Sequence, residues 1–492
     1  MDDGYFYPQI ARYIARGQGS TFNGIMLTNG YHPLWMLICV IGAWITPASY
    51  PLVQLLTSVQ DVLILGCVYT IVSVSRRAKM RGSVLGCLPL LFFGMVLGIW
   101  RLLEANLALA LQLSVLIIVC PVLSASFYDK LGRWRNLLIG TLFGLTMLAR
   151  LDLMFFVATI LIYEIVNTNW SLSLQTRTRS SLIQMTAAGM LLAPYFIWNI
   201  HQFGHLLPIS GAIKSTFPHP ERWGFSNFMY PVIGAIFLNS SLLIKKTRTS
   251  FENICILTAI AAALHMAYTL TFGELAPWYL TTGYLTLCFC VIWMVDSVLR
   301  VAPSLEWMET ALAALVFFAF LSLAALRIFS NFTYTHFVHR QVTFHGSYLE
   351  PKLGLAITLR DTLPKGSRIF VFDAPGSVAF YSGMSILPVD GLVANYAYND
   401  EVVKEGFSDY ATRKHIDYFI APYLHQGQIY DRLALRGSGG KAKQIMEIKA
   451  PLTKRDAGTV ILSDANLIFR YREITTDLET VYPEVGIWRI PH

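Results

Sequence analysis

The stretch DDGYFYPQIARYIARGQGSTFNGIMLTNGYHPLW (residues 2–35) opens the chain, and long apolar runs follow it at once. From about Leu34 to Phe329 these runs are about 15–22 residues long, and short polar gaps separate them. A helix of that length crosses a hydrocarbon core of roughly 30 Å. The pattern predicts an α-helical polytopic membrane protein with about 10–11 spans.

Composition and charge exclude two broad classes. Of the 492 residues, 54% are hydrophobic and 14% are charged, and the mean hydropathy is +0.50. Soluble proteins carry about 25% charged residues, so one ordinary water-soluble domain is excluded. The net charge of +8 does not indicate a nucleic-acid partner, because the basic residues form short clusters between apolar runs. These clusters are residues 76–79, 130–135, 177–179 and 245–248.

The basic clusters also predict how the chain crosses the membrane, because cytoplasmic loops carry an excess of Lys and Arg. With all four clusters on one side, ten candidate spans alternate without conflict. The loop 201–227 and the chain after Phe329 then face away from the cytoplasm. The candidate spans are 53–74, 84–100, 105–123, 137–149, 153–167, 182–199, 228–244, 253–273, 279–299 and 309–329.

The apolar run 34–49 fits this alternation poorly, because a full crossing there would place the first 33 residues in the cytoplasm. We therefore expect a re-entrant or juxtamembrane segment, which Thr46-Pro47 ends. The alternative is that the run does cross, and that 137–167 is one long kinked span instead of two.

The chain after Phe329 has the composition of a soluble α/β domain. Apolar and polar residues alternate there, Gly, Pro, Asp and Lys are frequent, and strand-like runs follow a predicted helix over 343–363. No P-loop and no GxGxxG motif supports a nucleotide site. The expected domains are therefore 1–52, an external loop with short helices, 53–329, a membrane domain, and 330–492, an extracytoplasmic α/β domain. The strand-like runs are 367–372, 418–421, 459–462, 467–471 and 486–490.

The seven cysteines all lie in apolar runs and form no CxxC pair. This distribution argues against a disulfide framework and against a zinc site.

The opening stretch combines groups that suit chemistry at a membrane surface. Asp2 and Asp3 are adjacent carboxylates, and a short amphipathic helix follows, with Arg12 and Arg16 on one face. Such a helix would lie on membrane lipids with its arginines at the level of the phosphates. Carboxylates and cations held there suggest chemistry on a lipid phosphate. The alternative is an acidic helix cap followed by a turn-rich connector.

These residues resemble the first extracytoplasmic loop of GT-C glycosyltransferases, the superfamily of the protein O-mannosyltransferases and the lipid A aminoarabinose transferase. The string is most similar to a bacterial branch with a DDAYYYFxIAxNIAxGxGxTFDGxxxTNGxHPLW pattern. Later strings resemble the same branch, and together the resemblance covers most of the membrane domain and part of the tail. These strings are LARLD at 148–152, APY at 193–195, FGHLLPISGAIK at 203–214 and DGLV at 390–393.

The resemblance implies transfer of a sugar from a polyprenyl-phosphate carrier to an extracytoplasmic acceptor, with inversion at the anomeric carbon. It places Asp3 at the position of the general base that deprotonates the acceptor hydroxyl, with Asp2 beside it. The acceptor is a glycan, a glycolipid or a protein. The implied location is the bacterial cytoplasmic membrane. No cofactor is implied with certainty, no metal ligand set is predicted, and dependence on a divalent metal stays open.

The leaving lipid phosphate needs cationic partners. The candidates are His32, Arg12, Arg150 and Lys214, although the aminoarabinose enzymes have an acidic-basic-Pro-Pro string where this chain has Tyr31-His32-Pro33-Leu34. Arg150 and Asp152 lie between two apolar runs, where ionisable groups are costly. For His32, Arg150, Asp152 and Lys214 the alternative interpretation is an ordinary loop or helix-end residue without a role in binding. Further predicted substrate-binding residues are Asn29 in the TNG string, Asp152, Glu274 and Tyr279.

Two other classes remain open: a transporter or flippase, which would also have many helices and a few buried charges, and a non-catalytic envelope-assembly subunit. Against a transporter stand the acidic motif in a loop, the external domain and the lack of evident inverted repeats. GT-C enzymes carry a membrane helix just before the acidic loop, whereas Asp3 here follows the initiator almost directly. We therefore expect that about 20–30 residues, containing one more span, are missing from the start.

Overall fold

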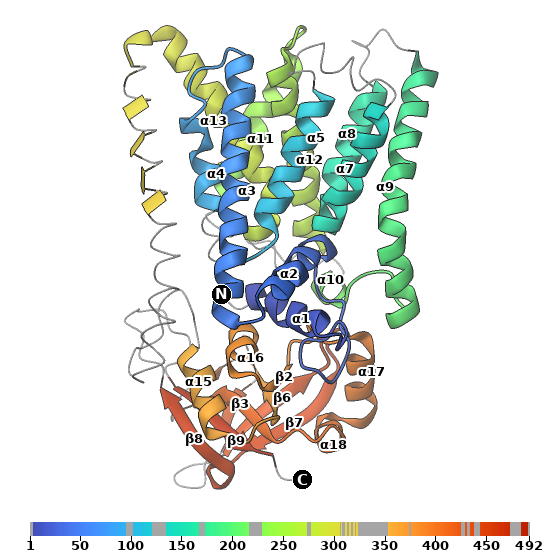
Figure 1. The fold of residues 1–492 in the computed structure, drawn as a ribbon, viewed down its shortest axis with the longest axis vertical. Coiled ribbons are helices and arrows are strands. Elements are labelled where there is room, and N and C mark those ends of the chain that lie inside the picture. The colour runs from blue at the N-terminus through green and yellow to red at the C-terminus, as the bar shows by residue number, and fades with distance from the viewer. Residues whose placement is uncertain are drawn as a thin grey trace.

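The computed structural model describes most of the chain, and two stacked parts make up the molecule (Figure 1). Long helices run side by side along the major axis, and a domain of helices and strands lies at one end of them. The described residues are 3–94, 102–120, 134–166, 173–215, 229–272, 277–305, scattered positions within 307–322, 353–372, 375–424, 429–430, 433–436, 443–472 and 484–490.

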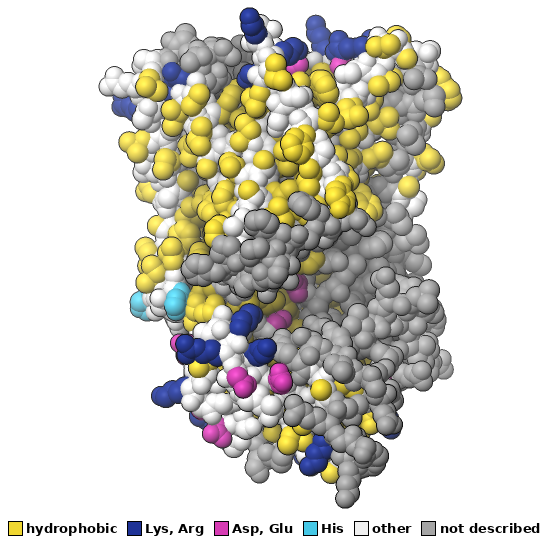
Figure 2. All heavy atoms as spheres, turned by 180° about the vertical axis from the view of Figure 1, so that it is seen from behind, with side chains coloured by type: hydrophobic (Ala, Val, Ile, Leu, Met, Phe, Trp, Pro, Cys, Tyr) yellow, Lys and Arg dark blue, Asp and Glu magenta, His cyan; other side chains and the backbone are white. Residues whose placement is uncertain are grey.

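The described helices overlap nine of the ten predicted spans, although only 84–94 of the span 84–100 is described. Among the described residues, four helices, α3, α9, α12 and α13, are long and apolar enough to cross a membrane by length and composition. Many apolar side chains lie on the face of this part that Figure 2 shows, as expected for contact with lipid. The span 309–329 lies largely outside the described residues. The helices are α3 Ser49–Arg77, α4 Leu88–Phe93, α5 Ala105–Val119, α7 Trp134–Ala149, α8 Met154–Val166, α9 Leu174–Phe203, α11 Met229–Ser241, α12 Ser250–Phe272 and α13 Thr281–Val301.

Helices α7 and α8 form an antiparallel hairpin, so 137–167 is not one kinked span. Arg135, near the start of α7, pairs with Glu164, near the end of α8, at 3.1 Å. Two residues 29 positions apart meet in this way only if the chain turns back between them. The turn is Arg150, whose backbone is extended, followed by the short 3-10 helix Leu151–Leu153. The alternative of a single kinked helix is therefore wrong.

The opening residues form three short helices between the two parts of the molecule (Figure 1). They are η1 Asp3–Tyr5, α1 Phe6–Ala15 and α2 Pro33–Ile45. Pro33 starts α2, where its missing N–H costs nothing, and the extended Thr46 before Pro47 ends it. The indole of Trp35, which is fully buried, donates to the Leu102 carbonyl at 2.9 Å and so attaches α2 to the membrane helices.

The C-terminal part is an α/β domain, as predicted. Three parallel strands, β2, β1 and β3, form one half of a five-stranded sheet in the order β2-β1-β3-β9-β8, with β9 antiparallel to β3 and β8. The other sheet has the order β4-β5-β6-β7. The elements are α15 Leu353–Thr362, β1 Arg368–Val371, α16 Gly376–Ser382, β2 Ser385–Pro388, α17 Tyr396–Glu405, α18 Phe407–Arg413, β3 Tyr418–Pro422, β4 Ile429–Tyr430, β5 Leu433–Arg436, β6 Lys443–Lys449, β7 Asp456–Leu462, β8 Leu467–Arg472 and β9 Glu484–Arg489.

The opening helices and the C-terminal domain share one hydrophobic core. Ile10 of α1, Val378 of α16 and Ile487 of β9 all belong to it and are fully buried. Polar contacts follow the same interface: the Ser385 hydroxyl donates to the Asn23 carbonyl at 2.9 Å, and the Asn395 amide donates to the Leu27 carbonyl at 3.0 Å. The C-terminal domain is thus held directly against residues 3–45.

Close packing of α7 on α9 makes Gly140 a sensitive position. A Cβ atom there would collide with the Gln184 carbonyl oxygen and lie 2.8 Å from the Cβ of Ala187, whereas Gly189 on α9 has open space around it. Gly140→Ala is therefore expected to lower the free energy of unfolding by about 1–3 kcal/mol, because the two helices must separate. Gly189→Ala is the matched control and should not lower the thermal unfolding midpoint. Equal midpoints for the two variants would contradict this packing.

Candidate functional site

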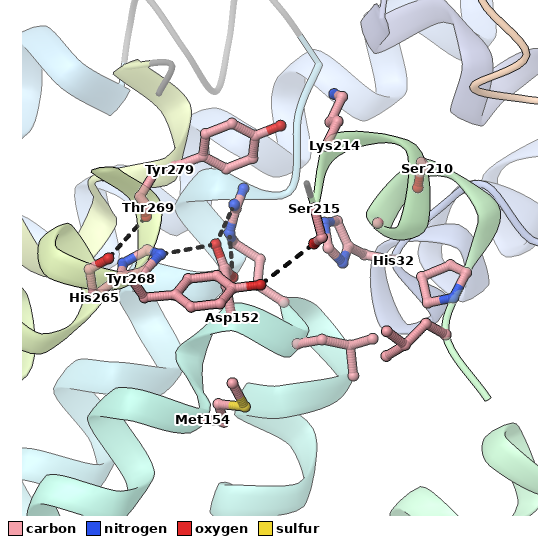
Figure 3. Close-up of a pocket in the computed structure, with 15 residues that line it drawn as sticks. His32, Asp152, Met154, Ser210, Lys214, Ser215, His265, Tyr268, Thr269 and Tyr279 are labelled. Atoms are coloured by element: carbon pink, nitrogen blue, oxygen red, sulfur yellow. Dashed lines mark hydrogen bonds and ion pairs between the residues drawn. The ribbon is translucent and has the colours of Figure 1, made fainter. Parts of the chain in front are cut away.

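A cavity of about 270 Å³ lies where the α7–α8 turn and α12 meet the short helix α10, Ile209–Lys214 (Figure 3). The imidazoles of His32 and His265 lie at its two sides, and the side chains of Tyr268 and Tyr279 extend along it. Its lining residues are His32, Arg150, Leu151, Asp152, Met154, Leu207, Pro208, Ser210, Gly211, Lys214, Ser215, His265, Tyr268, Thr269 and Tyr279. It is called the main cavity below.

A smaller pocket of about 60 Å³ adjoins the main cavity on the side of the C-terminal domain. It contains Asp3 and Tyr7 from the opening residues, Glu104 from the start of α5, and Leu392 from the C-terminal domain. It is called the acidic pocket below. The residues that line both spaces are His32, Arg150, Ser210, Lys214 and Tyr279.

Arg150 is the most deeply buried charge of the site, with 1% of its side chain exposed. Its Nη1 donates to Oε1 of Glu104 at 2.5 Å, and its Nε and Nη2 donate to the two carboxylate oxygens of Asp152 at 3.1 and 2.7 Å. The guanidinium also lies over the ring of Tyr279, 5.1 Å from its centre. One cation is therefore shared between two carboxylates, of which Glu104 is buried and Asp152 is partly exposed, and the fork geometry of arginine makes the bidentate pairing with Asp152 strong.

Each of the two carboxylates also faces a histidine. Glu104 accepts a hydrogen bond from the Tyr7 hydroxyl at 2.9 Å, and its Oε1 lies 3.6 Å from Nε2 of His32. On the other side, Nε2 of His265 lies 3.2 Å from Oδ2 of Asp152. We call the chain His32–Glu104–Arg150–Asp152–His265 the charge chain. It connects the acidic pocket with the main cavity.

Burial and charge together set the ionisation of these groups. Burial would raise the pKa of Glu104, but His32, Arg150 and the Tyr7 hydrogen bond outweigh burial, so the pKa of this carboxyl lies below its usual value. The pKa of Asp152 is lowered in the same way, because Arg150 and His265 outweigh its burial. Burial lowers the pKa of His32, and Arg150 and Lys214 lower it further against the opposing effect of Glu104.

Lys214 reaches both spaces from the end of α10, and a set of polar contacts holds this helix in place. Asn29, fully buried, accepts a hydrogen bond from the Ile209 N–H at 3.0 Å and donates to Asn199 at 3.1 Å. The Nζ of Lys214 lies 5.7 Å from the centre of the Tyr279 ring. Asn29 thus does not line either space but fixes the helix that carries Lys214.

The C-terminal domain also contacts the segment that leads into α10. The ring of Tyr396 on α17 stacks on His205 with 3.7 Å between ring centres, and its hydroxyl donates to the Leu207 carbonyl at 2.9 Å. Gly30 abuts the Leu392 carbonyl so closely that a Cβ atom there would collide with it. The position of α10 therefore depends on the C-terminal domain as well as on the membrane helices.

Most of the residues expected from the sequence converge here, and two are placed differently. Asp3, His32, Arg150, Asp152, Lys214 and Tyr279 line the two spaces. Arg12 lines neither: its guanidinium bonds to the Ser49 hydroxyl at 2.7 Å and the Phe380 carbonyl at 3.1 Å, and it stacks on the Phe380 ring. Asn29 is the second, as described above. Asp2 and Glu274 lie outside the described residues.

Sequence reasoning missed Glu104, Tyr7 and His265. Glu104 is an acid between two predicted spans, and His265 interrupts the run 253–273. The argument that singled out Arg150 and Asp152, that ionisable groups near apolar runs are costly, applies to both. Among the described residues, no group of three or more His, Cys, Asp or Glu side chains has an arrangement that could hold a metal ion.

Replacing Arg150 by Met should destabilise the protein strongly, by about 3–5 kcal/mol, because the buried carboxylate of Glu104 and the partly exposed one of Asp152 would lose their shared cation. The lowered pKa values of Glu104 and Asp152 mean that their ionised forms stabilise the fold above the pKa of an unfolded carboxyl, and that this contribution disappears as the pH falls. The difference between wild type and variant should therefore shrink below about pH 4.5.

Thermal unfolding across pH measures this effect. Arg360→Met is the control, because Arg360 and its partner Asp361 are both largely exposed and their pair contributes little. A control variant as unstable as Arg150→Met would contradict the importance of the shared cation.

Comparisons with known proteins bear on the fold. No family model matches the sequence, and no curated protein matches it. The crystal structure of ArnT from Cupriavidus metallidurans bound to undecaprenyl phosphate is similar, with a TM-score of 0.49 and 12% identity, over 79% of this chain and 81% of ArnT. The archaeal oligosaccharyltransferase AglB from Archaeoglobus fulgidus, in complex with an inhibitory peptide and a dolichol-phosphate, matches with a TM-score of 0.51 and 10% identity.

That match covers 86% of this chain and 65% of AglB, so the chain spans just under two thirds of the length of AglB. The chain therefore shares the overall fold of AglB over the matched length. In this chain apolar helices form one part of that fold, and an α/β domain follows them in the sequence.

Proposed function

We propose that this protein is a membrane glycosyltransferase that moves a sugar from a polyprenyl-phosphate-linked donor to an acceptor hydroxyl of a glycan, a glycolipid or a protein. The observation that carries the proposal is the wall shared by the main cavity and the acidic pocket. It places His32, Arg150 and Lys214 between a carboxylate, Asp3, and a larger space beside the membrane helices. A transfer reaction needs such a division, with a base on one side of the anomeric carbon and cations on the other.

The main cavity suits the lipid phosphate. Met154 of α8 and Tyr268 and Thr269 of α12 line it, so one side of the cavity belongs to membrane helices, where a polyprenyl chain can lie. Three groups that can carry a positive charge, Arg150, Lys214 and His32, line this cavity and would face the phosphate.

The acidic pocket suits the acceptor. Asp3 begins η1 and lines this pocket together with Leu392 of the C-terminal domain, so an acceptor presented by that domain would reach the carboxylate. In the proposed step Asp3 takes the proton of the acceptor hydroxyl as its oxygen attacks the anomeric carbon. The bond from that carbon to the phosphate oxygen breaks on the opposite face, so the configuration inverts. Asp2 remains the neighbouring acid of the expected motif.

The proposed location is a bacterial cytoplasmic membrane with the C-terminal domain outside the cytoplasm. The basic residues of three loop clusters, Arg76-Arg77, Arg177 and Lys245-Lys246, belong to the ends of helices remote from the C-terminal domain, and Figure 2 shows dark blue side chains gathered at that end. Cytoplasmic loops carry such an excess of basic residues. This distribution supports an external position for the C-terminal domain and both spaces.

Asp3→Asn should abolish sugar transfer, with a loss of at least about a hundredfold in kcat, because the amide cannot accept the hydroxyl proton. Binding of undecaprenyl phosphate should persist, since the donor phosphate lies in the main cavity. The assay is transfer from a polyprenyl-phosphate-linked sugar in proteoliposomes, with Asp361→Asn, an exposed acid on the C-terminal domain, as the control. Transfer by Asp3→Asn at the wild-type rate would exclude this mechanism and favour a transporter or a non-catalytic subunit.

Labelling of introduced cysteines tests the orientation, because the seven native cysteines are all buried. Ser408→Cys on the C-terminal domain and Lys246→Cys in the loop between α11 and α12 both occupy exposed positions. A membrane-impermeant maleimide should label position 408 in intact spheroplasts and position 246 only after permeabilisation. Labelling in the reverse order would overturn the proposed orientation.

A further inference from the structure

His32 has an unusual environment at the centre of the shared wall. Its Nε2 lies 3.6 Å from Oε1 of Glu104, and its backbone N–H donates to the Tyr7 hydroxyl at 3.3 Å. Within the described residues its other ring nitrogen, Nδ1, is buried and has no hydrogen-bond partner. A buried polar atom without a partner costs free energy unless a ligand satisfies it. The ring is therefore oriented from one side by Glu104 and left with an unused nitrogen.

Two cations, Arg150 and Lys214, and three carboxylates, Asp3, Glu104 and Asp152, lie around His32 in the two spaces. Burial nevertheless favours the neutral imidazole and lowers the pKa of His32. The ionisable groups that face His32 or share its two spaces are Tyr7, Tyr31, Glu104, Arg150, Asp152, Lys214, Asp3, Tyr279, Tyr268 and His265.

The proposed reaction changes the charge of the phosphate. The donor is a phosphodiester with one negative charge, whereas the released carrier is a phosphate monoester whose second ionisation has a pKa of about 6. As the anomeric carbon–oxygen bond breaks, its electron pair stays on the phosphate oxygen and adds one negative charge. In the proposed step Asp3 takes the proton of the acceptor hydroxyl. The site must also accommodate the additional negative charge on the phosphate, which the donor complex did not contain.

We propose that His32, which faces Glu104, takes up one proton from solvent when the phosphate monoester binds, and so makes the site selective for the monoester over the diester. The imidazolium donates from Nδ1 to the phosphate dianion, and Nε2–H stays directed at Glu104. Donor binding leaves His32 neutral, and carrier release returns the proton to solvent. His32 then contacts the ligand directly, and Glu104 is a positioning residue. This inference rests on the proposed donor class, but its test requires no transfer activity.

Calorimetric titration of the purified protein in detergent tests the proton. The probes are undecaprenyl phosphate and its methyl phosphodiester, each titrated at pH 8–9 in two buffers of different ionisation enthalpy. We expect about one proton taken up per monoester bound and about none per diester. The dissociation constant of the monoester should rise about tenfold per pH unit, and that of the diester should stay constant.

Three variants locate the proton. His32→Asn should bind the monoester more weakly and take up almost no proton, and His201→Asn, exposed near the end of α9, should match wild type. Glu104→Gln should reduce proton uptake with the monoester and should weaken monoester binding more than diester binding, because it removes the charge that favours the imidazolium. A purely structural role of Glu104 would weaken both lipids equally.

Each contrary outcome has a distinct meaning. Binding of the monoester by wild type without proton uptake, or equal uptake by His32→Asn, would overturn this inference alone. Equal uptake with the diester would also overturn it, because the selectivity would be absent. If neither lipid binds wild type, the proposed donor class fails together with the inference.

Discussion

The shared pairing of Arg150 with Glu104 and Asp152 is the interaction on which the rest of the site depends. Removal of a guanidinium and two carboxylates from water is costly, and only close, well-directed hydrogen bonds compensate for it. The three groups come from different places, since Glu104 begins α5, while Arg150 and Asp152 form the turn between α7 and α8. The hydrogen bonds among these charges therefore hold the start of α5, the end of α7 and the start of α8 close together. Both spaces lie beside this junction.

Two further side chains connect these charges with other helices. Tyr7 reaches Glu104 from α1, and His265 reaches Asp152 from α12, so the charge chain connects an external helix with a membrane helix. Lys214 differs, because α10 is held by contacts from Asn29 and Tyr396 that belong to two different parts of the molecule.

The sequence allowed prediction of those features that depend on local patterns. Apolar run lengths predicted the spans, alternation predicted the α/β domain, and the cost of ionisable groups beside apolar runs singled out Arg150 and Asp152. Features that depend on distant partners were not predictable. Arg12 was expected to face lipid phosphates because its helix is amphipathic, but the C-terminal domain covers that helix and the Phe380 carbonyl takes the guanidinium. Asn29 was expected near substrate, yet its hydrogen bonds go to Ile209 and Asn199, about 170–180 positions away.

The hydrophobic core shared by α1, α16 and β9 has a consequence for how the protein is made. Ile10 precedes the membrane helices in the sequence, whereas Ile487 of the same core follows them. The acidic pocket, which Leu392 helps to line, is therefore completed only after the membrane helices between these segments have been synthesised. Contacts between such distant segments form slowly, because a large loop entropy must be overcome first. Until these segments meet, the apolar face of the amphipathic helix α1 has no protein partner. Binding to the membrane surface would cover that face in the meantime.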